Sequence, residues 1–336
     1  MMKEILNNKI KTYIKSQKLD KQLRLGENFI VKFLAQGEYN VNFILKGANE
    51  KYVFRLNTKS QLNLKNQIKY EYEALKSLEI SGVTPKVYFL DSSKKYFEYG
   101  ILIMEFLNGR PLKYKEDLQT AAKIFSTIHS IDVDTINYTG FIEESNIFTE
   151  RIIESNGLLN EFLRAPKVDL EMKKFFEVFL EWAEVNKINQ KYFTQNKWHV
   201  INNTEVNSEN FIIGSQKSYL IDWEKPVISD PCQDLTQFLA PTTTLWKTDY
   251  IFKPDEKEIF IKEYTKGLKN GDKNIRDRIE LYTPYLYLRA LSWCAYAYLE
   301  YQREDKEIKN MDTYNKINQY LDVNFIKALL RPYFNF

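Results

Sequence analysis

Short apolar runs separated by turn residues fill the first third of the chain. Segments 29–47 and 51–57 are rich in β-branched and aromatic residues and are interrupted by turn residues such as Gly37, a pattern typical of neighbouring β-strands. Residues 61–80 then carry apolar side chains at helical spacing, and two more apolar runs follow. The pattern predicts three strands, a helix and two further strands within residues 25–107.

Helical periodicity dominates the rest of the chain. Apolar residues recur at intervals of three and four over 118–129, 171–187 and 281–304, while a β-like island at 199–223 interrupts the helices. We therefore predict an α+β architecture of two lobes joined near Asn108–Gly109. Its parts are a leading helix at 1–20, a β-rich N-lobe at 21–107 with a five-stranded antiparallel sheet and one main helix, and a larger, mainly helical C-lobe at 108–336.

Length, charge and composition narrow the class of protein. The 336 residues are enough for two lobes around a cleft. A net charge of +3, from 48 basic and 45 acidic residues, argues against a nucleic-acid-binding surface. Only two histidines are present, which excludes a histidine-rich metal site, and the two distant cysteines are typical of a reducing compartment. Without a membrane-length apolar run or a secretory signal, we expect a cytoplasmic protein that binds no membrane.

Three N-terminal residues carry chemistry suited to phosphate. Gly37 lies in a predicted β-turn-β, where a missing side chain lets backbone N–H groups approach a phosphate, although such a glycine is more often only a turn. Arg55 ends a strand, where its cation could reach phosphate oxygens or simply be a surface charge. Glu71, on the following helix, could hold that cation by an ion pair or be an ordinary solvated residue.

Two later stretches could bind an adenine ring and a metal ion. Residues 101–112 form an apolar strand followed by a polar connector, which suits an adenine ring but also an ordinary buried strand. Asn210 and Asp222 flank a predicted hairpin, and amide and carboxylate oxygens at its two ends can meet on one Mg²⁺. This pair is the most specific signal in the chain, because the apolar triplets 211–213 and 219–221 fix both polar residues at the mouth of the hairpin.

The order of these features resembles the aminoglycoside phosphotransferase and choline kinase family, which are small-molecule kinases with a protein-kinase-like fold. The family pattern is H-x-D-x-x-x-x-N, a hairpin, D-W/F-E and D-P-x-x-D-L. The matching residues here are Asn203, Glu205, Asn210, Asp222-Trp223-Glu224, Asp230-Pro231 and Asp234-Leu235. The resemblance covers about residues 25–305 and implies a bilobal protein-kinase-like fold.

The resemblance also implies roles for individual residues. Asn210 and Asp222 would bind Mg²⁺, and Glu205 would act as the catalytic base for the acceptor hydroxyl. Arg55, held by Glu71, would contact the nucleotide phosphates. The remaining implied positions are the backbone of Glu105 and Leu107 against adenine, Asp234 as a brace for the catalytic loop, and Asp230 in either a bracing or a substrate role.

Three positions depart from the family pattern. Arg55 stands where many members have lysine, and it keeps the charge but binds phosphate as a fork. Asn203 replaces a histidine, and asparagine can make similar backbone hydrogen bonds. Glu205 replaces the catalytic aspartate; the ordinary pKa of a glutamate side chain, about 4.3, is close to the value of about 3.9 for aspartate, but glutamate is longer by one C–C bond, about 1.5 Å. Because both metal residues are retained and this chemistry rests mainly on positioning and charge, we expect an active enzyme.

The function expected from this reading is an ATP- and Mg²⁺-dependent phosphotransferase, with GTP left open as the nucleotide. Its partner would be a small polar molecule with a hydroxyl group, such as an aminoglycoside, an amino alcohol like choline, or a sugar. Trp182, Trp246 and Trp293 lie where the family builds its acceptor pocket, although core packing is the more ordinary role for each. The protein would be a monomer or a homodimer. The alternative is a pseudokinase that binds nucleotide or ligand without transfer; a protein kinase fits less well, because no long activation loop follows Asp222.

Overall fold

The computed structural model describes residues 2–37, 39–60, 63–303 and 311–334, with side chains from residue 5 onward. Parts of the predicted segments, at residues 1, 38, 61–62, 304–310 and 335–336, lie outside the described residues. Contacts group the chain into two compact units, one formed by Met1–Ile142 with Glu209–Val227 and the other by Glu143–Ser208 with Ile228–Phe336. The lobe boundary at 107 remains a prediction, because a grouping by contacts measures compactness and does not define lobes.

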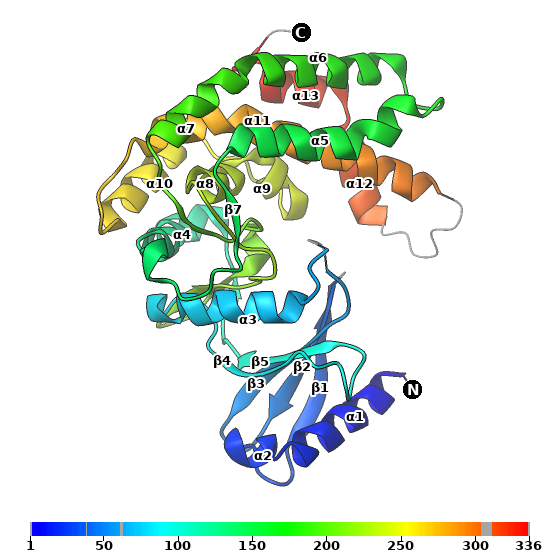
Figure 1. The fold of residues 1–336 in the computed structure, drawn as a ribbon, viewed down its shortest axis with the longest axis vertical. Helices are drawn as coiled ribbons and strands as arrows, with labels where there is room; N and C mark the ends of the chain where they lie inside the picture. The colour runs from blue at the N-terminus through cyan, green and yellow to red at the C-terminus, as the bar shows by residue number, and fades with distance from the viewer. Residues whose placement is uncertain (1, 38, 61–62, 304–310, 335–336) are drawn as a thin grey trace. The chain divides into compact units, whose positions relative to one another are not determined.

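A five-stranded antiparallel sheet forms the centre of the first unit (Figure 1). Helices α1 (Met2–Ser16) and α2 (Leu19–Gln22) precede it, and α3 (Gln67–Leu78) lies between its third and fourth strands in the chain. The strands, in spatial order, are β1 (Ile30–Gln36), β2 (Asn40–Lys46), β3 (Lys51–Asn57), β5 (Gly100–Glu105) and β4 (Val87–Asp91). The predicted succession of three strands, a helix and two strands is confirmed.

The two faces of this sheet have different partners because side chains alternate along a strand. Tyr52, Phe54 and Leu56 of β3 belong to one buried cluster with Ile10 and Tyr13 of α1. The side chain of the intervening residue, Arg55, contacts Glu71 of α3 instead. Helix α1 therefore packs on one face of the sheet, and the other face carries the charged residues expected at the site.

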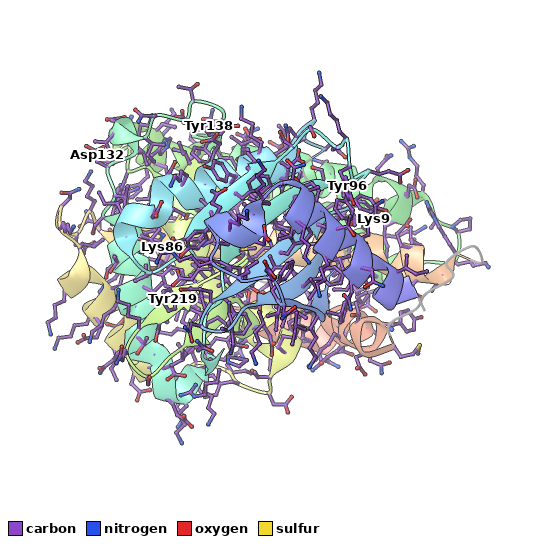
Figure 2. All side chains as sticks on the ribbon, turned by 90° about the horizontal axis from the view of Figure 1, so that it is seen from below. Lys9, Lys86, Tyr96, Asp132, Tyr138 and Tyr219 are labelled. Atoms are coloured by element: carbon purple, nitrogen blue, oxygen red, sulfur yellow. The ribbon has the colours of Figure 1, made fainter. Side chains whose placement is uncertain are left out.

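Aromatic residues extend the α1 side of the unit. Figure 2 shows Lys9 of α1 beside Tyr96, with its ammonium 5.9 Å from the ring centroid. The Tyr13 ring lies 4.9 Å from that of Tyr96, and its hydroxyl donates to Asp91 at 2.6 Å. These contacts attach the leading helix to the β4–β5 connection.

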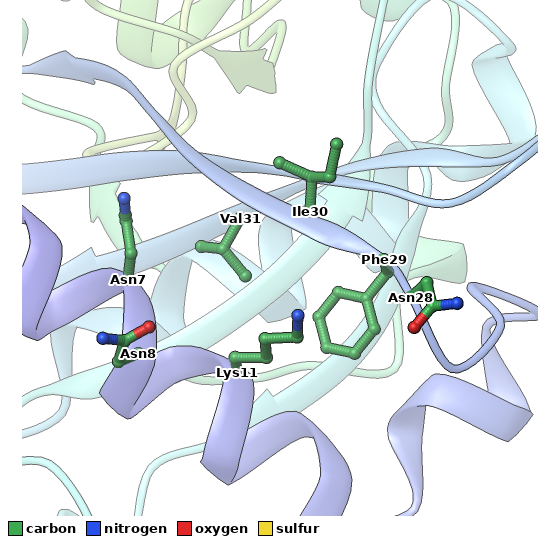
Figure 3. A pocket seen from close by; sticks show the side chains of 7 residues that line it. All are labelled: Asn7, Asn8, Lys11, Asn28, Phe29, Ile30 and Val31. Atoms are coloured by element: carbon green, nitrogen blue, oxygen red, sulfur yellow. The ribbon is translucent and has the colours of Figure 1, made fainter.

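A cleft of 520 Å³ opens between α1 and β1 (Figure 3). It is lined by Asn7, Asn8, Lys11, Asn28, Phe29, Ile30 and Val31. Since α1 packs on the face of the sheet opposite Arg55, this cleft is separate from the charged residues described below.

The first unit continues with β6 (Arg110–Pro111), α4 (Tyr114–His129), and the hairpin of β9 (Phe211–Ile213) and β10 (Ser218–Leu220). These three short strands pair in the order β10-β9-β6. Gly109, just before β6, is required by close approach, since a Cβ there would lie 2.7 Å from both the Ile213 carbonyl oxygen and the Ile212 Cγ2. The connector is thus pressed onto the hairpin that carries Asn210 and Asp222.

The second unit is mainly helical. Its predicted helices at 171–187 and 281–304 are confirmed as α6 (Leu170–Asn186) and α11 (Ile275–Gln302). The other elements are α5 (Ile147–Arg164), α7 (Lys191–Gln195), β8 (Val200–Asn202), α8 (Cys232–Leu239), α9 (Pro241–Lys247), α10 (Pro254–Gly267), α12 (Met311–Tyr320) and α13 (Val323–Leu330). β8 belongs to one sheet with β7 (Ile142–Glu144) and β11 (Val227–Ser229), whose first residues are grouped with the first unit. In the described part of the chain, every helix is too short or too polar to span a bilayer.

Candidate functional site

A buried arginine forms the centre of the charged group in the first unit. Arg55 is 8% exposed, and its guanidinium pairs with Glu71 of α3 and with Asp222 Oδ1 at 3.2 Å. Its Nε donates to Asn42 Oδ1 at 3.0 Å, across the β2–β3 pair. Arg55 is therefore fixed in direction by three groups, which excludes the alternative of a loose surface charge.

Burial disfavours the charged forms of both Glu71 and Arg55, so by itself it shifts their two pKa values in opposite directions. Burial raises the pKa of the Glu71 carboxyl above its usual range, and although Arg55 opposes the shift, Asp222 adds to it. Burial works against the charge of Arg55 as well, but the carboxylates of Glu71 and Asp222 outweigh it and raise the arginine pKa. Arg55 thus stays a cation, and Glu71 is a buried partner rather than the solvated helix residue of the alternative interpretation.

Asn210 and Asp222 lie at the mouth of the β9–β10 hairpin, as predicted from the apolar triplets. The amide of Ile221 donates to the carbonyl of Asn210 at 2.8 Å, so the two chain segments are adjacent there. Asp222 has a positive φ of 63°, which is uncommon for a residue other than glycine and is often found at functional sites. Its side chain is 28% exposed and remains accessible to a ligand.

Oxygen donors suited to Mg²⁺ gather at this mouth. Carboxylate oxygens of Asp222 and Glu224 lie within 4.8 Å of one another, and the Asn210 amide belongs to the same hairpin. Hard divalent cations prefer such carboxylate and amide oxygens. The donor set therefore fits the predicted metal, and Glu224 joins the two residues that the sequence pattern had singled out.

The predicted glycine position lies in a tight turn. The Gly37 N–H donates to the Asn40 carbonyl at 2.9 Å. Apart from its chain neighbours, the closest atom to a Cβ built at Gly37 would be that carbonyl oxygen, 4.0 Å away. Packing within the described part of the unit does not demand glycine here, and the approach of a phosphate to this backbone stays a prediction.

Hydrogen bonding at the end of β5 limits which backbone groups of the predicted nucleotide contacts could face adenine. The Glu105 N–H donates to the Lys86 carbonyl at 2.8 Å, so only its carbonyl could face a base. Leu107 lies beyond the end of β5 and is half-buried. Both residues remain predicted nucleotide contacts.

Glu205 belongs to the second unit, in the loop after β8. Asp234 accepts from the backbone N–H groups of Asn203 at 2.7 Å and Thr204 at 2.8 Å, and Thr204 has a positive φ of 67°. The Asn203 side chain accepts from the Glu205 N–H at 3.0 Å. Asp234 is thus a brace of this loop, and Asn203 makes the backbone hydrogen bond expected of a histidine substitute.

Asp230, for which two roles were open, forms a buried ion pair. It accepts from Arg278 of α11, and the two side chains are 3% and 1% exposed. Arg278 also donates to the carbonyls of Lys273 at 2.7 Å and Asn196 at 2.6 Å. These contacts favour the bracing role.

We expect Asp230→Asn to lower the free energy of unfolding by about 3 kcal/mol, because it leaves the buried Arg278 charge without its carboxylate. Urea denaturation followed by tryptophan fluorescence measures the change, with the exposed Asp249→Asn as the matched control. An activity loss without any loss of stability would instead favour the substrate role.

The predicted tryptophans separate into two groups within the second unit. Trp182 stacks on Phe334 at a centroid distance of 5.1 Å and contacts Tyr285, which is ordinary packing. Trp246 and Trp293 meet edge to face at 5.6 Å, and Trp293 is 37% exposed. Only this second pair presents an aromatic surface that could serve an acceptor.

Several residues at these sites were not predicted. Asn40, Asn42 and Gln67 surround the charged group, and Arg278 holds Asp230. A signal for two of them was present, since asparagines 40 and 42 punctuate an otherwise apolar strand. Their partners are far away in sequence, so periodicity does not find them.

A protein-family model and several solved structures match this chain. The model of the phosphotransferase enzyme family matches residues 30–270, whereas no curated protein matches the chain by sequence. Among solved structures, a choline kinase from Cryptosporidium parvum is similar with a TM-score of 0.63 and 16% identity, covering 94% of this chain and 95% of that chain.

Two further structures show the same fold. A spectinomycin phosphotransferase in complex with ADP and spectinomycin has a TM-score of 0.61 and 16% identity, covering 93% of this chain and 96% of that chain. Choline kinase LicA from Streptococcus pneumoniae has a TM-score of 0.57 and 20% identity, covering 91% of this chain and 98% of that chain. These similarities confirm the predicted α+β, protein-kinase-like fold.

Proposed function

Because the chain belongs to the phosphotransferase enzyme family, we propose that it transfers the γ-phosphate of ATP to a hydroxyl group of a small polar molecule. The observation that carries this proposal is the pair of salt bridges that Arg55 makes with Glu71 and Asp222. They present a fixed cation and an accessible carboxylate beside the mouth of one hairpin. One of the similar structures is a complex with ADP, which supports a nucleotide as the donor.

Each residue has a defined task in the proposed reaction. Arg55 binds phosphate oxygens, and Asn210, Asp222 and Glu224 would hold Mg²⁺. The ion, when bound, neutralises charge on the nucleotide phosphates. The acceptor oxygen forms a bond to the γ-phosphorus as the bond to ADP breaks, and Glu205 accepts the proton of the hydroxyl.

We propose an amino alcohol as the acceptor class. The similar choline kinases support this class, and so does the half-exposed Trp246–Trp293 pair, because indole faces attract cations. An aminoglycoside is the second candidate, supported by the spectinomycin phosphotransferase.

The test is turnover of MgATP, and of MgGTP, with choline, ethanolamine, aminoglycosides and sugars. We expect choline to be phosphorylated, and its neutral isostere 3,3-dimethylbutan-1-ol to have a kcat/KM roughly tenfold or more lower, as expected from loss of a cation–π contact. Equal turnover of both alcohols would overturn the cationic acceptor, and absence of any MgATP binding at millimolar concentration would overturn the kinase itself.

A further inference from the structure

Asn40 and Asn57 are cross-strand partners at the ends of β2 and β3. The Asn40 Nδ2 group donates to the Glu224 carboxylate, and both residues are buried. The Nδ2 group of Asn57 donates to Asn40 Oδ1 at 3.0 Å. Since an asparagine amide carries its acceptor and its donors on opposite branches, the bond from Asn57 turns the NH₂ group of Asn40 toward Glu224.

The main chain of Glu224 is held from a second direction. Gln67, the first residue of α3, donates through Nε2 to the Glu224 carbonyl. The Gln67 Oε1 in turn accepts from the Ser60 hydroxyl at 2.7 Å, which fixes the orientation of this amide as well. Two oriented, buried amides from different elements therefore fix both the side chain and the backbone of Glu224.

Asn40 is uncharged, which affects the net charge around the Glu224 carboxylate. The oxygens of Asp222 and Glu224 lie within 4.8 Å of one another, and Asp222 already has the Arg55 cation as a partner. A lysine at position 40 would add a second positive charge beside Glu224. An asparagine instead fixes the position of the carboxylate and adds no charge beside it.

Asn40 also closes the glycine turn (Gly37 and Asn40), because its carbonyl accepts from the Gly37 N–H at 2.9 Å. One residue thus ends the turn proposed to approach phosphate and holds the carboxylate beside Asp222. We infer that Asn40 is a positioning residue that fixes the glycine turn against the Asp222–Glu224 pair, so that nucleotide and cation bind as one unit. The inference rests on the proposed function.

Calorimetric titration with ADP, in the presence of Mg²⁺ and in the presence of EDTA, tests it. We expect Asn40→Ala to weaken MgADP binding roughly tenfold, in line with loss of one hydrogen bond to a charged group, and to leave metal-free ADP binding unchanged. The control is Asn28→Ala, an exposed asparagine in the same unit, which should bind both forms as the parent does. The metal-free titration also verifies that each variant is folded.

Asn57→Ala supplies an independent second variant. It leaves Asn40 and Glu224 in place but removes the bond that orients the Asn40 amide, together with the bonds from Asn57 Nδ2 to the carbonyls of Tyr39 at 3.3 Å and Lys59 at 2.8 Å, so we expect a loss of MgADP affinity at least as large. The loss of MgADP affinity in the double variant should be smaller than the sum of the two single losses, because both changes act on the Asn40–Glu224 bond.

Four outcomes would overturn the inference. Equal losses with and without Mg²⁺, or additive losses in the double variant, would show that Asn40 only supports the fold. An Asn40→Ala protein that binds MgADP as tightly as an active parent would overturn the inference alone. A parent that binds ADP under neither condition would overturn the proposed function together with it.

Discussion

Asp222→Asn is expected to lower kcat by at least about 10³-fold, the equivalent of about 4 kcal/mol of transition-state stabilisation. The change removes one carboxylate charge from the proposed metal site while keeping the size of the side chain. Asparagine tolerates a positive φ better than most residues, so it can adopt the 63° observed at this position. Arg55 keeps Glu71 and Asn42 as partners, and we therefore expect the fold to survive.

The measurement combines steady-state turnover with thermal unfolding. Glu98→Gln, an equivalent loss of charge at an exposed position of the same unit, is the matched control and should behave as the parent. An Asp222→Asn enzyme that retains a tenth or more of the parent kcat would be incompatible with a metal-binding role for Asp222.

Glu205→Gln is expected to reduce kcat by roughly 10²- to 10³-fold, within the range for loss of a general base. The loop should keep its shape, because Asp234 and the Asn203 side chain hold it through backbone N–H groups that the substitution does not touch. For the same reason, affinity for MgADP should remain that of the parent. Loss of kcat without loss of nucleotide affinity would separate a base from a nucleotide-binding residue.

Glu205→Asp tests whether the longer side chain is suited to this loop. A displacement of about 1 Å can cost on the order of 10²-fold in rate, so we expect the aspartate variant to be slower by roughly that factor. A faster variant would mean that glutamate is a handicap, inherited in a site that is losing activity. A pseudokinase would show no turnover in the parent and therefore no effect of either substitution.

Short-range sequence patterns predicted the strands and helices in which apolar residues recur with a clear period. The five strands and helices α4, α6 and α11 follow from strong periodicity, and the hairpin mouth follows from two apolar triplets that place Asn210 and Asp222 together. Helix α5 was not predicted, because Asn156 and Gly157 interrupt its pattern near the centre. Glycine costs about 1 kcal/mol in a helix relative to alanine, and only tertiary packing offsets such a cost.

The parts of the site that sequence did not predict depend on long-range partners. Asn40 and Glu224 are 184 residues apart in the chain, and Asp230 and Arg278 are 48 apart. No spacing rule connects such pairs, because sheet register and helix packing bring them together. The resemblance to a family supplied Glu205 and the roles of Asn210 and Asp222, whereas the positioning contacts of Asn40, Gln67 and Arg278 became visible only in three dimensions.

Transfer of phosphate from ATP to a hydroxyl group can be followed directly by ³¹P NMR of the parent protein with MgATP and the acceptor panel. We expect the γ-phosphate signal to decline while ADP and a phosphate monoester appear, and neither product to form with Asp222→Asn. A parent protein that binds MgATP yet yields neither ADP nor a monoester with any acceptor would contradict the proposed transfer.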